Sequence, residues 1–457
     1  MKGLLFTALV AAGGAAAALA VPWVGVLAYA FLATLRPAEM WQTTIGWGFS
    51  DVVALGMVVG WSLQGFGNWR LHRATPSLVA LVALLVWSAV CSVLAIDPSM
   101  AWPYVSNLAK IVLPVVIGLT LVQNMSQLRQ LAWVQVIAYT YVSWVMNASY
   151  FFQNYNRAEI DGYTGGRASF AIGLVTLVSV SFFLAIGPAK RWQRVAAAAC
   201  GILMLHTVLL TFSRGGLLGL FASGMVALWL VPKRPRVFAA IGVVALAGIL
   251  LAGPRVWERF GTTFAESDER DASAQNRIGL WQNCLTLMVE SPLFGVGPNN
   301  FPHLAVTRFG WAPAGRFGDR KEGHTLWLQT GAEMGIPGFV FLISYYGFVC
   351  WYLLPLARGR RGDPDENNLA QMVIVALAGF AVSAQFVSLE GLEPPYYVAM
   401  LGAGLLKLHG NRLAAGAADP AAAVPPAGGT ALPPPVLLPP DGASATPWTM
   451  PPPRRPS

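Results

Sequence analysis

The chain has 457 residues, of which 55% are hydrophobic and only 11% are charged. Soluble globular proteins carry about 25% charged residues, so this composition excludes an ordinary soluble protein and indicates a membrane protein. The net charge of +9 does not indicate a nucleic-acid-binding protein, because the basic residues fall in short clusters between apolar runs, where they act as topology signals.

The N-terminal segment has two interpretations. Lys2, an apolar run and the small residues at 18–20 form a pattern that is typical of a cleavable signal peptide. The alternative is a first membrane helix that is retained. Retention is favoured because the apolar pattern continues at once through residues 22–35, and we expect residues 3–35 to form one long, kinked pass.

Long apolar runs follow one another along most of the chain. They cover residues 51–66, 77–96, 104–122, 129–150, 168–187, 195–212, 215–231, 237–253, 335–357 and 369–389, with a shorter run at 396–406. Each of the longer runs can cross a hydrocarbon core of about 30 Å as a helix, which satisfies its own backbone polar groups in lipid. The sequence therefore predicts an all-α polytopic membrane protein, a bundle of about twelve transmembrane helices.

The charges of the connecting loops predict the orientation of the bundle. Basic residues gather at 70–73, 190–194, 233–236 and 358–361, and the positive-inside rule places these loops in the cytoplasm. The intervening segments then face the other side: 97–103, 151–167, the turn at 213–214, 254–324 and 390–395. Both termini are expected inside if the run at 396–406 also spans.

These patterns divide the chain into four parts. N-terminal transmembrane helices occupy 1–253, one large loop occupies 254–324, C-terminal transmembrane helices occupy 325–412, and a Pro/Ala-rich tail occupies 413–457. The tail cannot bury a core and is expected to be disordered and cytoplasmic. Eight basic and eight acidic residues leave the large loop without net charge, so it can be translocated.

Within the large loop, residues 272–290 have the spacing of an amphipathic helix. Ile278, Trp281, Leu285 and Met288 fall on one face, and a Ser-Pro pair at 291–292 ends the pattern. The segment 302–323 is expected to be irregular.

Arg214 is the first candidate for chemistry. It lies in a very short turn between two apolar runs, at the membrane surface on the side that the positive-inside rule leaves poor in basic residues. It could be a snorkelling arginine at a helix end. The more specific hypothesis is an anion-binding residue, because a guanidinium matches two phosphate oxygens at once and charges at a membrane are expensive and usually functional.

His324 lies just before the run that re-enters the membrane, and an imidazole can accept a proton near neutral pH. A single histidine at a helix start is more often structural. Arg167 ends the loop at 157–166, and Arg277 adds charge to the large loop. Glu333, nine residues after His324, is a candidate to pair with an arginine or to orient the histidine.

Other polar residues give weaker signals. Arg316, Arg320 and Lys321 are secondary candidates for substrate binding, and solvated surface charge explains them equally well. The four cysteines have no C-x-x-C spacing, and no cluster of His, Asp or Glu has the spacing of metal ligands, so no metal site is expected.

Several arginines and one histidine, without carboxylate pairs or metal ligands, suit a phosphate-bearing substrate whose leaving group is stabilised by fixed positive charge. A lipid diphosphate would place its anionic head at this interface. The rival class is a membrane transporter, which predicts discontinuous helices meeting at the bilayer midplane and inverted repeats. The sequence shows no such repeat and concentrates its polar residues in one loop.

Two motifs carry a family resemblance. Arg214 followed by Leu218 gives R-x3-L, and His324 followed by Gly335 gives H-x10-G, with a long loop before the histidine. Together they resemble the O-antigen ligase family, which includes Wzy-type polysaccharide polymerases and protein O-oligosaccharyltransferases. The likeness extends from about residue 21 to about residue 346.

Smaller matches resemble one branch, the exosortase-associated O-glycosylation ligases. They are Asp271 to Arg277 with Trp281, the Gly-Val-Gly turn at 295–297, and the Pro-Trp-Val-Gly segment at 22–25. Thr325 departs from the family pattern, in which a small polar residue or Asn often follows the histidine. This departure leaves the type of acceptor open.

The resemblance implies a metal-independent, inverting glycosyltransferase of the GT-C type without a cofactor. The donor would be an undecaprenyl-diphosphate-linked glycan at the periplasmic face of the bacterial inner membrane. Arg214 and Arg277 would hold the diphosphate, His324 would activate or orient the acceptor hydroxyl, and Arg167 would be a further arginine of the site. The acceptor could be lipid A core, another glycan chain or a protein.

Overall fold

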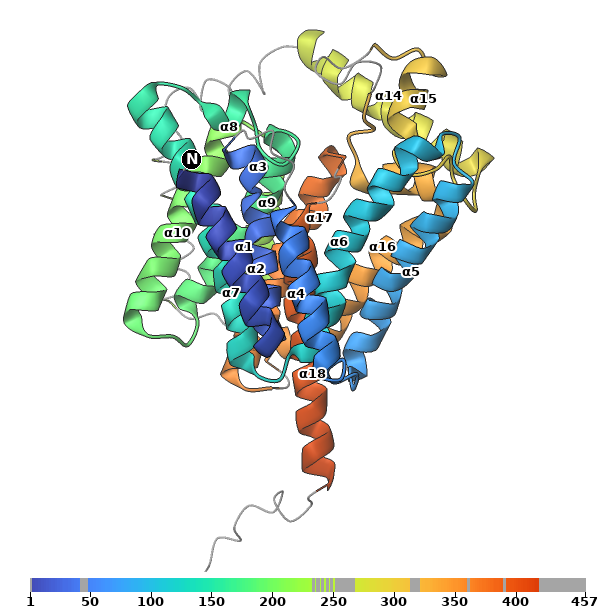
Figure 1. Cartoon of the computed structure of the whole chain (residues 1–457). Coiled ribbons are helices and arrows are strands. Elements are labelled where there is room, and N and C mark those ends of the chain that lie inside the picture. The colour runs from blue at the N-terminus through green and yellow to red at the C-terminus, as the bar shows by residue number, and fades with distance from the viewer. Residues whose placement is uncertain are drawn as a thin grey trace, which may run out of the picture. The chain divides into compact units, whose positions relative to one another are not determined.

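The computed structural model describes residues 2–41, 48–231, 268–312, 321–359, 362–388 and 392–418, with single positions at 235, 239, 242, 243, 246 and 250. Helices are the only regular elements in these residues, which confirms the all-α prediction (Figure 1). The predicted residues Arg316 and Arg320, most of the run at 237–253 and the tail beyond 418 lie outside the described residues.

The long helices follow the apolar runs, except for the helix at 268–290, which lies in the large loop. In chain order they are α1 (Lys2–Ala20), α2 (Pro22–Leu35), α4 (Phe49–Leu63), α5 (Thr75–Val93), α6 (Pro98–Leu121), α7 (Met125–Gln153), α9 (Arg167–Ile186), α10 (Arg191–Leu210), α11 (Arg214–Leu230), α14 (Asp268–Glu290), α16 (Leu326–Ala357), α17 (Pro364–Ser383) and α18 (Glu393–Ala418). Short helices are η1 (His72–Ala74), α3 (Pro37–Met40), α8 (Arg157–Ile160), α15 (Phe301–Thr307) and η3 (Ala384–Phe386).

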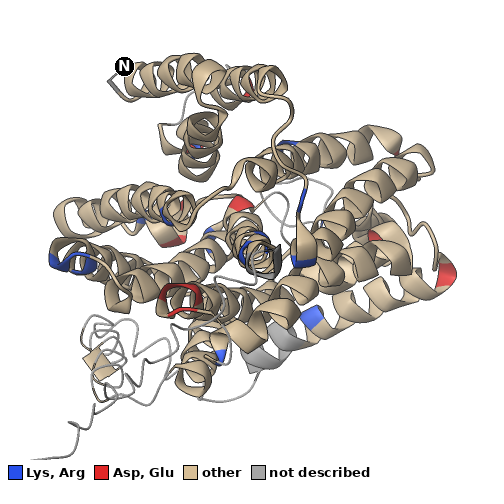
Figure 2. Ribbon diagram, turned by 90° about the horizontal axis from the view of Figure 1, so that it is seen from below, with Lys and Arg blue, Asp and Glu red and all other residues tan. Residues whose placement is uncertain are grey.

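Seven helices of the described part are long and apolar enough to cross a membrane. They are Gly3–Ala20, His72–Val93, Pro98–Leu121, Arg167–Ile186, Arg191–Leu210, Leu326–Ala357 and Pro364–Phe386. The helices α4 and α11 are apolar but shorter. The chain is therefore a multi-pass membrane protein, while the count of about twelve crossings stays a prediction. Charged residues mark only a few places in the helices when they are viewed from below (Figure 2).

The N-terminal segment differs from the prediction of one kinked pass. The backbone breaks at Val21, and α1 and α2 form an antiparallel hairpin in which Gly14 lies against Ala28 and Gly25 lies against Ala18. Small residues on both helices allow this close approach. The apolar pattern predicted the two helices, but it does not show whether the second helix continues in the direction of the first or reverses.

Those predicted basic loops that the structure describes lie at one end of the helices. The Arg73 guanidinium carbon lies 6.0 Å from the centre of the Tyr352 ring, near the end of α16. The loop that contains Arg358 follows α16 and leads into α17, where Asn368 lies against Gly187 in the loop between α9 and α10. The alternation of basic loops predicted from the sequence therefore agrees with the helix directions.

The other loops lie at the opposite end. The Asp97 backbone N–H donates to Asn300 Oδ1 at 2.7 Å, which joins the α5–α6 loop to the large loop. The Tyr163 hydroxyl donates to the Leu35 carbonyl, which joins the α8–α9 loop to the end of α2. The helices α14 and α15 also lie at this end (Figure 1).

The large loop contains more helix than the sequence predicted. The helix α14 ends at Glu290, as expected, but it begins at Asp268 rather than at residue 272. The prediction that 302–323 is irregular is wrong for its first part, because α15 covers Phe301–Thr307. The helix α15 is short and lies on a small apolar core formed by α14 and the start of α16, which a periodicity argument cannot detect in seven residues.

The helix α16 is broken at Gly335, where φ is +68° and ψ is −174°. The break releases backbone groups, and the turn after α14 satisfies them. The Val296 N–H donates to the Ala332 carbonyl at 3.0 Å, and the Gly297 N–H donates to the Glu333 carbonyl at 2.8 Å. The glycine of the H-x10-G motif thus joins the first half of α16 to the large loop.

Candidate functional site

Arg214 is the first residue of α11 and is exposed. Phe212 has a φ of +48°, and Ser213 caps the helix by accepting a hydrogen bond from the Gly216 N–H at 3.2 Å. This tight turn projects the arginine from the end of the helix. The missing side chain of Gly215 lets Phe386, in η3 after α17, pack against the first turn.

Arg277 in α14 meets the same phenylalanine. Its guanidinium carbon lies 6.0 Å from the centre of the Phe386 ring, and the Trp281 ring lies 6.3 Å from it. Phe386 therefore lies between the first turn of α11 and the large-loop helix. The Trp281 indole nitrogen is buried without a hydrogen-bond partner among the described residues.

Positive charge gathers around Arg277. Burial lowers the pKa of its guanidinium, and the positive charges of Arg214 and Arg167 lower that pKa further. Arg167 is the first residue of α9, and its Nη1 lies 3.8 Å from Glu159 Oε1. In the described part of the chain, neither Arg214 nor Arg277 forms an ion pair with a carboxylate. Arg214 and Arg167, from two other helices, thus lie within electrostatic reach of Arg277.

His324 lies in the same field. Burial lowers the pKa of its imidazole to about 4, and the positive charges of Arg277 and Lys321 act in the same direction. The imidazole is therefore neutral at neutral pH and can accept a proton or a hydrogen bond. Its backbone has a φ of +51°, an uncommon conformation for a residue other than glycine, and such conformations concentrate at functional sites.

The backbone beside His324 is fixed by neighbouring residues. Thr325 caps α16, since its Oγ1 accepts a hydrogen bond from the Leu328 N–H at 3.4 Å. The Gly323 N–H donates to Gln329 Oε1 at 3.0 Å, and the Ser388 hydroxyl donates to the same oxygen. His324 therefore lies between two residues that are both hydrogen-bonded to their surroundings.

Glu333 supports the backbone around His324 indirectly, through Gln329. Glu333 is 3% exposed, and its carboxylate accepts a hydrogen bond from Gln329 Nε2 at 2.9 Å. Gln329 in turn holds the residue before His324, so Glu333 supports the loop conformation through this amide.

Some residues of this site are absent from the sequence-based candidates. Phe386 and Ser388 lie within the apolar run 369–389, and Gln329 lies shortly before the run 335–357, so the sequence pattern does not single them out. The available signal was a polar pair four positions apart, at 329 and 333, on one face of an otherwise apolar helix. Arg316 and Arg320 lie outside the described residues. Among the described residues, no group of three or more His, Cys, Asp or Glu side chains could hold a metal ion.

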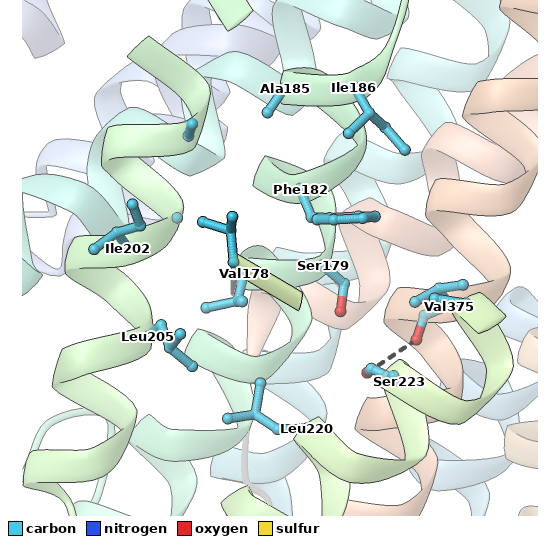
Figure 3. A pocket seen from close by; sticks show the side chains of 15 residues that line it. Val178, Ser179, Phe182, Ala185, Ile186, Ile202, Leu205, Leu220, Ser223 and Val375 are labelled. Carbon is cyan, nitrogen blue, oxygen red and sulfur yellow. Dashed lines mark hydrogen bonds between the residues drawn. The ribbon is translucent and has the colours of Figure 1, made fainter. Parts of the chain in front are cut away.

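An apolar cavity of about 280 Å³ lies further along α11, between this helix and α9, α10 and α17 (Figure 3). Val178, Phe182, Leu205 and Leu220 point into it, and almost all of its lining is hydrocarbon. The Ser223 hydroxyl donates to the Val375 carbonyl at 3.2 Å, so this lining hydroxyl is already satisfied.

The fold and this group of residues define a helical membrane protein with arginines and one neutral histidine gathered at one end of its helices. Residues 199–343 match the sequence profile of the O-antigen ligase family. The matched segment contains Arg214, Arg277 and His324, whereas Arg167 precedes it, and it covers less than half of the chain. This match confirms the family resemblance predicted from the two motifs and supports glycan transfer as the activity. No curated protein matches the chain.

Proposed function

We propose that this protein is a glycosyltransferase that moves an oligo- or polysaccharide from undecaprenyl diphosphate to a hydroxyl acceptor. The observation that carries the proposal is the field of Arg167, Arg214 and Arg277 beside a neutral His324. Arg214 and Arg277 have no carboxylate partner among the described residues, so their charges repel each other, and a bound anion relieves that repulsion. A diphosphate carries the charge and the oxygen geometry that such a cluster binds.

The proposed chemical step assigns a role to each of these residues. The acceptor oxygen forms a bond to the anomeric carbon of the donor sugar while the bond from that carbon to the diphosphate oxygen breaks. The polyprenyl diphosphate leaves with the electron pair, and the arginines stabilise its charge. His324 accepts the hydroxyl proton, and attack from the face opposite the leaving group inverts the anomeric centre.

Donor binding should also change the pKa of His324. The positive charge of Arg277 is one cause of the low pKa of His324, and a bound diphosphate offsets that charge. The pKa of the imidazole should therefore rise in the donor complex toward the range in which a general base works best. The buried indole N–H of Trp281 is a further donor for a substrate oxygen, since a buried donor without a partner is costly.

The apolar cavity along α11 supports a lipid-linked donor, because it offers a hydrocarbon surface on the helix that begins with Arg214. The basic loops gather at the other end of the helices, so the positive-inside rule favours a site that faces the periplasm. We therefore infer an enzyme of the bacterial inner membrane.

The purified full chain in detergent tests the proposal. With undecaprenyl-diphosphate-linked glycan and a hydroxyl acceptor, Arg277→Ala and His324→Ala should each lower the rate of transfer by about 100-fold or more. Arg308→Ala is the matched control, because Arg308 belongs to the same loop but pairs with Glu290 at 2.7 Å. Full activity of Arg277→Ala or His324→Ala, or an equal loss in the control, would overturn the proposal.

A further inference from the structure

A second cavity, of about 450 Å³, lies among α2, α3, α4, α6 and the start of α18. Its volume is within the range of ordinary small-molecule sites, about 300–1,000 Å³. The rings of Tyr29 and Phe49 contribute to its wall. Its polar lining consists of Arg36, Glu39, Ser50, Asn107, Lys110 and Glu393.

The charges in this wall are balanced. Arg36 Nη1 lies 3.0 Å from Glu39 Oε1, and Arg36 Nη2 lies 3.0 Å from Glu393 Oε2. Lys110 Nζ lies 3.2 Å from Asp51 Oδ1. Both cations of the lining are therefore paired with carboxylates, so the lining offers no unpaired cation that would bind an anionic ligand.

The cavity instead presents hydrogen-bonding groups of both kinds. The carboxylates of Glu39 and Glu393 accept, the ammonium of Lys110 donates, and the amide of Asn107 and the hydroxyl of Ser50 do both. A sugar hydroxyl is also both donor and acceptor, and hydrogen bonds to charged groups are stronger than those between neutral groups. A neutral polyhydroxyl compound is thus the chemical complement of this wall.

Two walls of the cavity are connected to the candidate site. Glu39 Oε2 accepts a hydrogen bond from the Thr164 N–H at 2.6 Å, in the loop that ends at Arg167. Glu393 begins α18, and five residues earlier Ser388 donates to Gln329 beside the histidine. The cavity therefore lies at the same end of the helices as the arginine cluster.

We propose that this cavity is a subsite for one or two neutral sugar units of a substrate glycan. The inference rests on the proposed glycan transfer for its biological role, but sugar binding itself does not depend on catalysis. The glycan could belong to the donor or to the acceptor, and both present the same hydroxyl groups.

The first experiment measures binding to the full chain in a detergent without a sugar headgroup. Saturation-transfer NMR with D-glucose and N-acetyl-D-glucosamine should show contact with the protein, and inorganic phosphate should not displace either sugar. Ala38→Trp fills the cavity from the exposed face of α3 and should weaken binding about tenfold or more, the effect of losing one charge-assisted hydrogen bond. Ala199→Trp, at an exposed position on α10, is the matched control and should bind as the unaltered chain does.

A second pair of variants tests the polar wall without adding bulk. Asn107→Ala removes a lining amide, and Gln153→Ala removes an exposed amide at the end of α7 outside the cavity. Only the first should weaken sugar binding. The proposal is overturned if neither sugar shows contact, if phosphate displaces the sugars, or if Ala38→Trp and Asn107→Ala both bind them normally.

Transfer kinetics then distinguish the two sources of the glycan. Ala38→Trp should raise the KM for the acceptor if the acceptor glycan occupies the cavity, and the KM for the donor if the donor glycan does. An unchanged KM for both substrates contradicts the role of the cavity in transfer. If His324→Ala binds sugars but the unaltered chain transfers no glycan, the proposed function fails while the sugar subsite stands.

Discussion

The pH dependence of transfer tests the role of His324 most directly. Its pKa is lowered from 6.5 to about 4 by burial and by the charges of Arg277 and Lys321. At pH 5.5 an imidazole with a pKa of about 4 is about 97% neutral, whereas one with the ordinary pKa of about 6.5 is only about 9% neutral. The free enzyme should therefore retain its base at pH 5.5, where an unperturbed histidine would lose about nine-tenths of its activity.

The assay is the pH profile of kcat/KM for the donor, since this ratio reports the ionisation of the free enzyme. Its acid limb should lie near pH 4, and the acid limb of kcat should lie higher, because the bound diphosphate offsets the arginine charges. Lys321→Gln removes one cause of the low pKa and should move the limb of kcat/KM to higher pH, whereas Lys190→Gln, at the other end of the helices, should not.

The sign of the effect is fixed by the direction of the shift. A histidine with a lowered pKa in the folded protein binds a proton more readily in the unfolded chain. The stability that it contributes to the folded state is therefore present above pH 6.5 and is lost as pH falls toward 4. The profile must therefore be recorded where the protein still elutes as a folded species. An acid limb of kcat/KM near pH 6.5 that disappears in His324→Ala would refute the reasoning.

Two further substitutions test the support of the site. Gly335→Ala places a Cβ at a positive φ against the backbone of the large loop. It should lower the melting temperature and reduce the free energy of unfolding by about 1–3 kcal/mol. Gly347→Ala is the control, because there is open space around Gly347 in the same helix, and it should be neutral or slightly stabilising. Gln329→Ala leaves the Gly323 N–H without its partner. In transfer assays it should lower kcat, while thermal unfolding should show only a small loss of stability. The exposed Gln282→Ala is the control. Equal effects of either variant and its control contradict the role given to that residue.

The fold was largely predictable because lipid requires each span to satisfy its own backbone, so apolar runs and helices coincide. The prediction failed at positions where the spacing of apolar residues carries no information on the structure. Periodicity does not reveal whether the chain continues or reverses at Val21, and it does not detect a helix as short as Phe301–Thr307. The start of α14 was placed too late because its first turn is polar on all sides and shows no apolar spacing.

The candidate site was predictable from residues whose chemistry is conspicuous in a membrane protein. Arg214, Arg277 and His324 stand out because charge and imidazole are rare against an apolar background. The residues that position them do not stand out, because Gln329 and Phe386 act through contacts between segments that are far apart in the chain. Such contacts follow from the packing of helices, which no local pattern encodes.

The break at Gly335 explains how a loop histidine and a loop arginine can be held together. At one end of the first half of α16, Gln329 anchors the backbone before His324. At its other end, the carbonyls released by the break accept hydrogen bonds from the turn that follows α14, the helix that carries Arg277. These two residues therefore belong to one unit that is fixed by the kink rather than by the membrane helices. Arg214 belongs to the membrane helices, so the positive field forms only where the two parts meet, and a change in their contact should alter donor binding without altering either part.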